Sequence, residues 1–382
     1  MNYLSNFTKF NIDNSCICSL GFLTPGYKRN TNEHSKINPR DSQKNVSPAA
    51  PKILIIRYSS IGDIVLTTPV LRCLKKQWPE SVIHFAVKSS FAPVIKANPY
   101  IDKLHTFDGN WEPFLAGFKN ESFDWILDLH KNYRSWYLKK QFKAKKTAFD
   151  KVNFEKWMLV NLKVNKMPDM HLVDRYFDGI SSLGIENDGE GCDYFIPDNE
   201  KDTGKELEKL SPFVAVVTGG RYYTKQIPPD ILASAINQFN RPVVLLGGPE
   251  DKEHSKTVME KADKDVIIKD YTGKTSINGS AAIISKSTCL VTPDTGLMHI
   301  GAALKKPVVS VWGNTVPAFG MYPYFGDEEK AARLSAIIEN KSLSCRPCSK
   351  LGYKSCPKKH FKCMREIDPA GIAKRVKEFT GE

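Results

Sequence analysis

The chain has 382 residues, more than one ordinary core needs, so we expect two domains of usual size. Its composition, with 41% hydrophobic and 25% charged residues, is typical of a globular protein and excludes a fibrous or wholly disordered chain. The formal net charge of +13 favours anionic partners, and the sequence holds no apolar run near the roughly 20 residues that span a bilayer.

The N-terminal region, residues 1–50, is polar and rich in Asn, Ser and Lys, which predicts a disordered extension. A short apolar patch over residues 17–23 lacks the basic and small-residue flanks of a signal peptide. The nine cysteines are odd in number and mostly scattered, so we expect a protein of the reducing cytoplasm.

A first α/β unit is predicted over residues 51–200. Residues 53–56 form a continuous apolar run, which is typical of a buried parallel strand, and a turn over residues 58–63 follows. Residues 64–77 carry apolar side chains at helical spacing, and residues 82–87 form the next predicted strand. The alternation continues with strands over residues 103–107 and 125–128 and a helical segment over residues 133–142.

A polar, charged segment over residues 201–211 is the predicted linker, and a second α/β unit is predicted over residues 212–345. Its predicted strands cover residues 213–217, 243–246, 289–292 and 308–311, and its predicted helices cover residues 230–239, 280–286 and 297–304. Residues 346–382 are a Cys- and Lys-rich tail with a predicted C-terminal helix. The pattern therefore predicts two Rossmann-like, doubly wound α/β domains that face a central cleft.

Small and polar residues follow several predicted strands, where doubly wound sheets bind their ligands. They stand at residues 59–63, 218–221, 247–250 and 293–296. Gly219 and Gly220 would let the backbone approach a phosphate, and Arg221 and Lys225 would neutralise a diphosphate. The alternative is that the glycines only make tight turns. Neither glycine pair fits the dinucleotide pattern or the P-loop pattern, which weighs against a dehydrogenase or a kinase.

The segment over residues 292–299 has a more specific pattern. Asp294 stands at a predicted strand end, where its carboxylate can cap the helix that follows, and that helix N-terminus would offer an anion site. The alternative is a plain capped helix with His299 as a buried core residue.

Two motifs resemble glycosyltransferase family 9, the lipopolysaccharide heptosyltransferases. Residues 56–69, with Ser59-Ser60-Ile61-Gly62-Asp63, are similar to the opening of that family, and residues 294–304 resemble its donor-site motif. Residues 220–221, 225–229 and 313–317 match in order and spacing. The resemblance covers roughly residues 52–375. Tyr222-Tyr223-Thr224 and Gly301 depart from the family pattern, which leaves the donor sugar open.

The resemblance implies an inverting enzyme of GT-B fold that moves a heptose from an ADP-sugar to a lipopolysaccharide core or lipid A acceptor, with no cofactor and no metal. It implies Asp63 as the catalytic base. The implied donor-binding residues are Thr218, Arg221, Lys225, Glu250, Thr275, Asp294, Thr295, Gly296 and His299. The implied acceptor-binding residues are Arg57, Ser59, Ser60, Lys131 and Arg134. Direct displacement at an anomeric carbon needs one base and a stabilised leaving group, and one carboxylate opposite a basic, N–H-rich site meets that need.

Basic and aromatic residues alternate over residues 134–157, a mixture that suits an anionic membrane surface, although a charged helix face with buried aromatics is the alternative. We expect a peripheral protein on the inner face of the cytoplasmic membrane. The tail carries Cys345, Cys348, Cys356 and Cys363, which could bind zinc or serve no metal role. Between residues 341 and 365 there are six Lys, two Arg and no acid, which favours an anionic surface or ligand.

Three other functions remain as alternatives: a family member with another nucleotide sugar or acceptor, a sugar-nucleotide epimerase that shares the two-domain architecture, and a basic nucleic-acid-binding protein. The sequence contains no recognisable nucleic-acid-binding module, so we expect no nucleic-acid partner.

Overall fold

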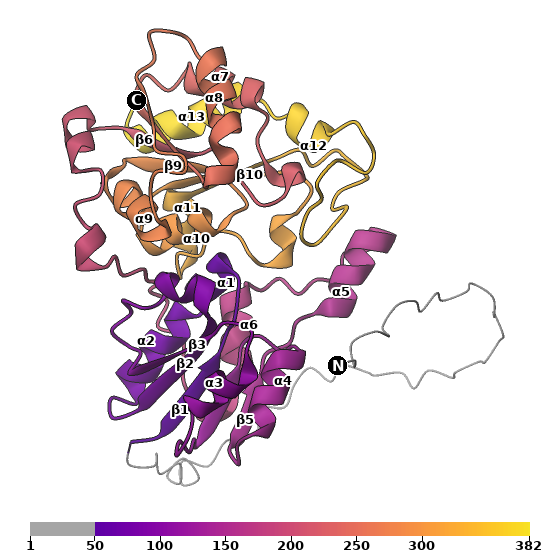
Figure 1. The fold of residues 1–382 in the computed structure, drawn as a ribbon. Coiled ribbons are helices and arrows are strands. Elements are labelled where there is room, and N and C mark those ends of the chain that lie inside the picture. Colours follow the sequence, from indigo (N-terminus) through magenta and orange to yellow (C-terminus); the bar gives the residue numbers. More distant parts are fainter. Residues whose placement is uncertain (1–49) are drawn as a thin grey trace, which may run out of the picture. The chain divides into compact units, whose positions relative to one another are not determined.

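The computed structural model describes residues 50–382, so the disordered extension predicted for residues 1–50 lies outside the described residues, apart from Ala50. The described chain contains two parallel sheets, each flanked by helices (Figure 1). This confirms the predicted fold class of two doubly wound α/β units.

The first sheet has the strand order β3-β2-β1-β4-β5. Its strands are β1 (Lys52–Ile56), β2 (Val82–Lys88), β3 (Lys103–Phe107), β4 (Trp125–Asp128) and β5 (Lys145–Ala148). Strand β1 is buried on both faces: Ile53 and Ile55 belong to the core on one side of the sheet, and Leu54 and Ile56 to the core on the other. The strand order reverses between β1 and β4, so the carboxyl ends of these two strands form the switch point.

The helices of the first half are α1 (Ile61–Val65), α2 (Thr68–Gln77), α3 (Trp111–Ala116), α4 (Tyr133–Lys140), α5 (Asn153–Trp157), which continues as the π-turn η2 (Met158–Leu162), and α6 (Leu172–Gly179). The single helix predicted over residues 64–77 is wrong, because α1 begins at Ile61 and α2 is separate. Pro69 cannot donate to a helical ladder, and the hydroxyls of Thr67 and Thr68 donate to the carbonyls of the preceding turn at 2.7 Å.

The second sheet has the strand order β11-β10-β9-β6-β7-β8. Its strands are β6 (Val214–Val217), β7 (Val243–Leu246), β8 (Ile268–Asp270), β9 (Cys289–Pro293), β10 (Val308–Trp312) and β11 (Ser335–Glu339). Its helices are α7 (Pro229–Ile236), α8 (Lys252–Lys261), α9 (Ile277–Lys286), α10 (Gly296–Ala303), α11 (Glu328–Leu334), α12 (Lys362–Arg365) and α13 (Pro369–Thr380). The switch point of this sheet lies between β6 and β9.

Two short 3-10 helices, η4 (Asp198–Glu200) and η5 (Lys205–Leu210), precede β6, and η5 lies within the predicted linker. The buried core continues from the first sheet to the second through helices α1 and α10, which contact each other. Helix α13 packs on α7 and on the strands of the second sheet. Among residues 50–382, no helix is long and apolar enough to cross a bilayer.

Candidate active site

The helices that follow the two switch points meet. Helix α1 follows β1, helix α10 follows β9, and a Cβ built on Gly296 would lie 2.6 Å from the side chain of Ile61. A Cβ on Gly62 would overlap the ring of His299 and lie 2.9 Å from its Nε2. Only glycine leaves room for this contact, so the two glycines place the first turns of α1 and α10 against each other.

Asp63 lies in the first turn of α1 and is largely buried, with its side chain 16% exposed. One carboxylate oxygen, Oδ1, forms an ion pair with Arg57. The other oxygen, Oδ2, accepts from the Ser60 hydroxyl at 2.6 Å and from the Ser60 backbone N–H at 3.1 Å. Burial acts to raise the pKa of Asp63, but Arg57 and the Ser60 hydrogen bonds outweigh it and lower that pKa below its usual range. The carboxylate is therefore ionised at neutral pH.

Arg57 is buried, and its three guanidinium nitrogens are all engaged with the protein. Nε donates to the carbonyl of Ser59 at 2.8 Å, one terminal nitrogen donates to the carbonyl of Leu129, and the other pairs with Asp63. The sequence suggested Arg57 as an acceptor contact. In the structure Arg57 pairs with Asp63 and stabilises the charge of that carboxylate.

The Gly219-Gly220 turn lies beside the start of α10. A Cβ on Gly220 would be 3.4 Å from the Thr295 side chain, and Gln226 donates to the carbonyl of Gly220 at 2.9 Å. A Cβ on Gly219 would overlap the carboxylate of Asp251. The buried carboxylate of Asp251 also accepts from the N–H of Gly248 at 2.9 Å, so it ties together the turns after β6 and β7. Sequence reasoning missed Asp251, although it directly follows the Gly247–Glu250 segment that we singled out.

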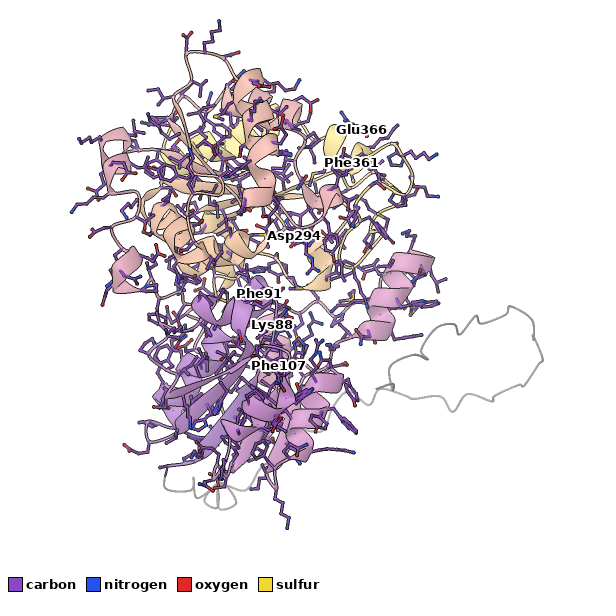
Figure 2. The ribbon with its side chains drawn as sticks, viewed as in Figure 1. Lys88, Phe91, Phe107, Asp294, Phe361 and Glu366 are labelled. Atoms are coloured by element: carbon purple, nitrogen blue, oxygen red, sulfur yellow. The ribbon has the colours of Figure 1, made fainter. Side chains whose placement is uncertain are left out.

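The N-terminus of α10 is open. Within residues 50–382 no side chain caps this helix, because the hydroxyl of its N-cap residue Thr295 pairs with Thr292 at 3.1 Å. Lys225 stands at the same edge and forms an ion pair of 2.6 Å with Asp294, the residue that follows β9 and is labelled in Figure 2. Asp294 also accepts from the hydroxyl of Thr315 at 2.8 Å. A fixed ammonium and unpaired helical N–H groups make an anion site.

The remaining predicted donor residues are distributed around this edge. Thr218 is fully buried and its hydroxyl contacts Ser255 at 2.9 Å, so it supports the turn from below. Arg221 is exposed, and its guanidinium lies 5.5 Å from the ring of Tyr222. Glu250 is exposed after β7, and the hydroxyl of Thr275 pairs with Ser280 at 2.9 Å just before α9.

His299 is buried between the two carboxylates of the site. Its Nδ1 has no hydrogen-bond partner among the residues that the structure describes. Burial lowers the pKa of His299, and the opposing fields of Asp294 and Asp63 do not offset it, so the imidazole is neutral. Its ring packs on Gly62 and so serves the contact between α1 and α10.

The other predicted acceptor residues lie on the first half. Ser59 and Ser60 form the turn that holds Arg57 and Asp63, and Lys131 and Arg134 are exposed after β4 and at the start of α4. Buried Asp128, at the end of β4, shapes this second loop by accepting from the N–H groups of His130 and Lys131 at 3.1 and 2.6 Å. Both loops at the β1–β4 switch point are thus fixed by a carboxylate.

Two lysines that the sequence did not assign to the site, Lys151 and Lys156, interact electrostatically with Asp63, and a third, Lys350, acts on both of them. Burial and the neighbouring Arg175 lower the pKa of Lys156 to about 8, and Lys350 and Lys151 act in the same direction while Asp63 opposes them. Lys151 also donates to the carbonyl of Lys131 at 3.1 Å. Lys151 and Lys156 were hidden in a lysine-rich stretch, and Lys350 belongs to the tail, so spacing alone gave no signal.

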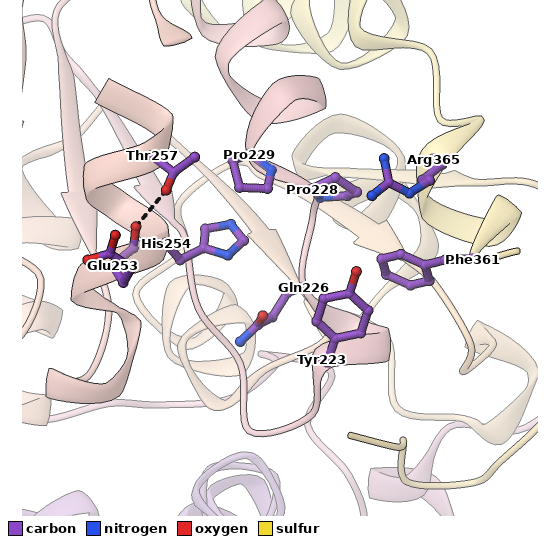
Figure 3. A pocket seen from close by; sticks show the side chains of 9 residues that line it. All are labelled: Tyr223, Gln226, Pro228, Pro229, Glu253, His254, Thr257, Phe361 and Arg365. Carbon is purple, nitrogen blue, oxygen red and sulfur yellow. Dashed lines mark hydrogen bonds between the residues drawn. The ribbon is translucent and has the colours of Figure 1, made fainter. Parts of the chain in front are cut away.

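The cysteines of the tail are free thiols, and Cys345 Sγ lies 3.8 Å from Nε2 of His360. In the part of the chain described here, no group of three or more His, Cys, Asp or Glu side chains is arranged to hold a metal ion. A pocket opens between residues 223–229, helix α8 and the tail (Figure 3). It is lined by Tyr223, Gln226, Pro228, Pro229, Glu253, His254, Thr257, Phe361 and Arg365.

Known proteins resemble this chain over most of its length. Glycosyltransferase family 9 (heptosyltransferase) matches residues 114–353. The lipooligosaccharide heptosyltransferase 2 of Haemophilus influenzae is 23% identical over 329 residues, which cover 78% of this chain and 92% of that protein. The crystal structure of the glycosyl transferase family 9 from Veillonella parvula DSM 2008 superposes with a TM-score of 0.69 at 20% identity, over 87% of this chain and 98% of that one. The structure of E. coli heptosyltransferase WaaC with ADP gives a TM-score of 0.61 at 18% identity, over 86% and 98%.

Proposed function

Since the chain belongs to glycosyltransferase family 9, the heptosyltransferase family, we propose that it transfers a heptose from an ADP-sugar to the core of a lipopolysaccharide-type glycolipid. Relatives named as lipopolysaccharide and lipooligosaccharide heptosyltransferases support the acceptor class. The similar WaaC structure holds ADP, which supports the nucleotide. In this proposal residues 51–200 serve the acceptor, and residues 212–345 serve the donor.

One observation carries the proposal. The turn that holds an ionised carboxylate, Asp63, lies against the open N-terminus of α10, through the contacts of Ile61 with Gly296 and of Gly62 with His299. A base and an anion site from two different sheets therefore adjoin. This is the arrangement that displacement of a diphosphate by a hydroxyl requires.

On the donor side, the diphosphate would bind the first N–H groups of α10 and the Gly219-Gly220 turn, with Lys225 and Arg221 balancing its charge. Asp294 orients Lys225 through their 2.6 Å ion pair. Glu250 and Thr275 stand at the same edge of the second sheet and would face the ribose and the adenine. Thr218 acts as support for the turn, because its hydroxyl is already engaged below it.

On the acceptor side, Asp63 would take the proton of the acceptor hydroxyl. A carboxylate offers about four acceptor positions, and the described residues occupy three of them, two through Ser60 and one through Arg57, which leaves one for the proton. As the O–H proton moves to Asp63, the hydroxyl oxygen bonds to the anomeric carbon. The bond from that carbon to the phosphate oxygen breaks, and ADP leaves with the electron pair. A single displacement of this kind inverts the anomeric configuration.

Lys225, Arg221 and the α10 dipole would stabilise the leaving ADP, so we propose that the reaction needs no metal ion. The lysines around Asp63, together with exposed Lys131 and Arg134, suit an acceptor that carries phosphate or carboxylate groups. We further propose that the protein works on the inner face of the cytoplasmic membrane, where such a glycolipid is anchored.

The test is a transfer assay with ADP-heptose and a core glycolipid acceptor, with and without EDTA, in which the anomeric configuration of the product is determined by NMR. The proposal expects an inverted product and EDTA-insensitive turnover. Melting curves with ADP, UDP and GDP identify the nucleotide, because only a bound nucleotide raises the melting temperature. Conversion of the donor without an acceptor would indicate an epimerase. A preference for UDP or GDP, or a retained configuration, would overturn the donor or the mechanism.

A further inference from the structure

Helices α4 and α5 expose aromatic side chains that a folded core would normally hide. Phe154 is 67% exposed and Trp157 is 52% exposed, and their rings stack on each other at 6.2 Å. Tyr133 and Trp136 on α4 are exposed and stacked in the same way, at 5.5 Å. We call these four side chains the aromatic face. Exposed aromatic pairs of this kind indicate a surface that binds something apolar.

The starts of the two helices lie together. Lys151, two residues before α5, donates to the carbonyl of Lys131, two residues before α4, at 3.1 Å. This bond brings Tyr133 and Phe154, in the first turns of their helices, to the same part of the molecule. The four aromatic residues therefore belong to two helices, α4 and α5, which are labelled in Figure 1.

The aromatic face lies in a strongly basic stretch of the chain. Residues 131–166 contain eleven Lys or Arg and two Asp or Glu, against a net charge of +13 for the whole protein. Lys140 lies 3.9 Å from the ring centre of Trp136. Lys139 belongs elsewhere, because it forms a 2.6 Å ion pair with buried Asp128. The aromatic residues are thus bordered by cations, the composition that binds anionic lipid headgroups.

Helix α5 and the π-turn η2 are also tied to the active site and to the second half. Lys151, just before α5, donates to the carbonyl of Lys131 at 3.1 Å, in the loop whose Leu129 carbonyl accepts from Arg57, the partner of Asp63. Lys163, just after η2, donates to the carbonyl of Pro347 at 2.6 Å and to that of Cys345 at 3.1 Å. The start of this element is thus linked to Asp63 through the loop after β4, while Phe154 and Trp157 on the element itself are exposed.

We propose that the aromatic face docks on an anionic bilayer, with Phe154 and Trp157 entering the headgroup region, and that this docking brings a membrane-anchored acceptor to Asp63 along the Lys151–Lys156 side of α5. The delivery of the acceptor to Asp63 rests on the proposed function, whereas the docking of the aromatic face on a bilayer does not. A second copy of this chain is a poor occupant, because its own basic stretch would repel this one.

The test uses the full chain and vesicles of phosphatidylethanolamine with phosphatidylglycerol, compared with vesicles of phosphatidylcholine. The variant is F154S/W157S, and the matched control is Ile267→Ser, an apolar side chain that is 51% exposed in the second half. Melting curves establish that both are folded. We expect wild type and control to float with the anionic vesicles, and the double variant to partition about tenfold or more weakly. Equal flotation of all three proteins overturns the proposal.

Kinetic measurements distinguish a failure of the proposed bilayer docking from a failure of the proposed transfer reaction. The double variant should raise KM for an acylated acceptor in vesicles and leave kcat/KM for the deacylated, water-soluble acceptor within about twofold of wild type. If the wild type uses neither acceptor, the proposed transfer fails while the flotation result still decides the surface. Light scattering tests for self-association. If the wild type self-associates and the double variant does not, the aromatic face is a contact between copies of the chain, and the bilayer is refuted as its occupant.

Discussion

The two turns that meet at the candidate active site occupy equivalent positions in their sheets but differ in how the helix that follows begins. Each follows a strand at the switch point of its sheet and leads into a helix. In the turn before α1, the carboxylate of Asp63 folds back onto Ser60 and closes the helix start. In the turn before α10, within the described chain, no side chain caps the helix, and Lys225 stands beside its N–H groups.

This difference teaches how one fold can supply both halves of a transfer reaction. A closed turn holds a negative charge in a fixed direction, which a base requires. An open turn presents N–H groups and a cation, which a leaving diphosphate requires. Each substitution changes one of the two turns and leaves the other as it is.

Asp63→Asn should give the largest effect. The amide keeps the shape of the side chain but cannot accept a proton, so we expect kcat to fall by about 10²–10⁴-fold. Asp263→Asn, an exposed carboxylate of the second half, is the matched control and should retain full activity. Steady-state kinetics with melting temperatures measure both. A variant that turns over within a few-fold of wild type would make Asp63 a structural residue only.

Lys225→Gln should weaken donor binding by about 10–100-fold, because a charge-assisted hydrogen bond to phosphate is lost. Calorimetric titration with ADP measures this, with the exposed Lys264→Gln as control. An unchanged ADP affinity would contradict the proposal that the diphosphate binds at the turn before α10.

Replacing Arg57 should move the pH dependence of the reaction. Because the pKa of Asp63 is lowered, its carboxylate stays ionised until the pH falls below the ordinary Asp pKa of about 3.9. The stability that the Arg57 pair contributes is likewise lost only below that pH. In Arg57→Met the guanidinium that lowers the pKa of Asp63 is gone, while the burial that raises this pKa remains, so the pKa should rise. The acid limb of kcat/KM should then shift upward, with about tenfold lower activity near pH 5. Arg57→Lys should shift it less, and an acid limb that stays in place in Arg57→Met would contradict the pairing.

The smallest effects compare the two turns directly. Ser60→Ala removes a 2.6 Å hydrogen bond to a carboxylate and should lower the free energy of unfolding by about 1 kcal/mol. Thr295→Ala removes only a 3.1 Å contact with Thr292, whose hydroxyl keeps a second partner at 2.9 Å, and should cost about 0.5 kcal/mol or less. Denaturant unfolding of the two variants measures the difference. The reverse order would mean that α10 is the capped helix.

The eight more buried strands could be predicted from sequence, because long apolar runs leave few alternatives for a buried parallel strand. The edge strands β5, β8 and β11 were missed, since their side chains are mostly exposed or half-buried and form no apolar run. The position of Asp63 followed from the turn after β1. The break before Thr68 could not be foreseen from helical spacing, since hydrophobic periodicity continues through it. It depends on Pro69 and on two threonine hydroxyls.

Contacts between distant segments were the other limit. The role of Arg57 depends on its depth behind Asp63, and the role of Asp251 depends on the overlap of its carboxylate with Gly219. Neither the burial of Arg57 nor the contact of Asp251 with Gly219 can be predicted from the spacing of residues along the chain. The same holds for Lys350, which lies almost two hundred residues from Lys156 in the chain and yet acts to lower its pKa.

We propose that proton removal and donor binding are divided between the two turns. Calorimetric titration of ADP into wild type, Asp63→Asn, Lys225→Gln and the double variant tests it most directly. We expect Asp63→Asn to bind ADP within about twofold of wild type, and the double variant to match Lys225→Gln, because separate sites give additive effects. A loss of ADP affinity in Asp63→Asn as large as that in Lys225→Gln would contradict the division.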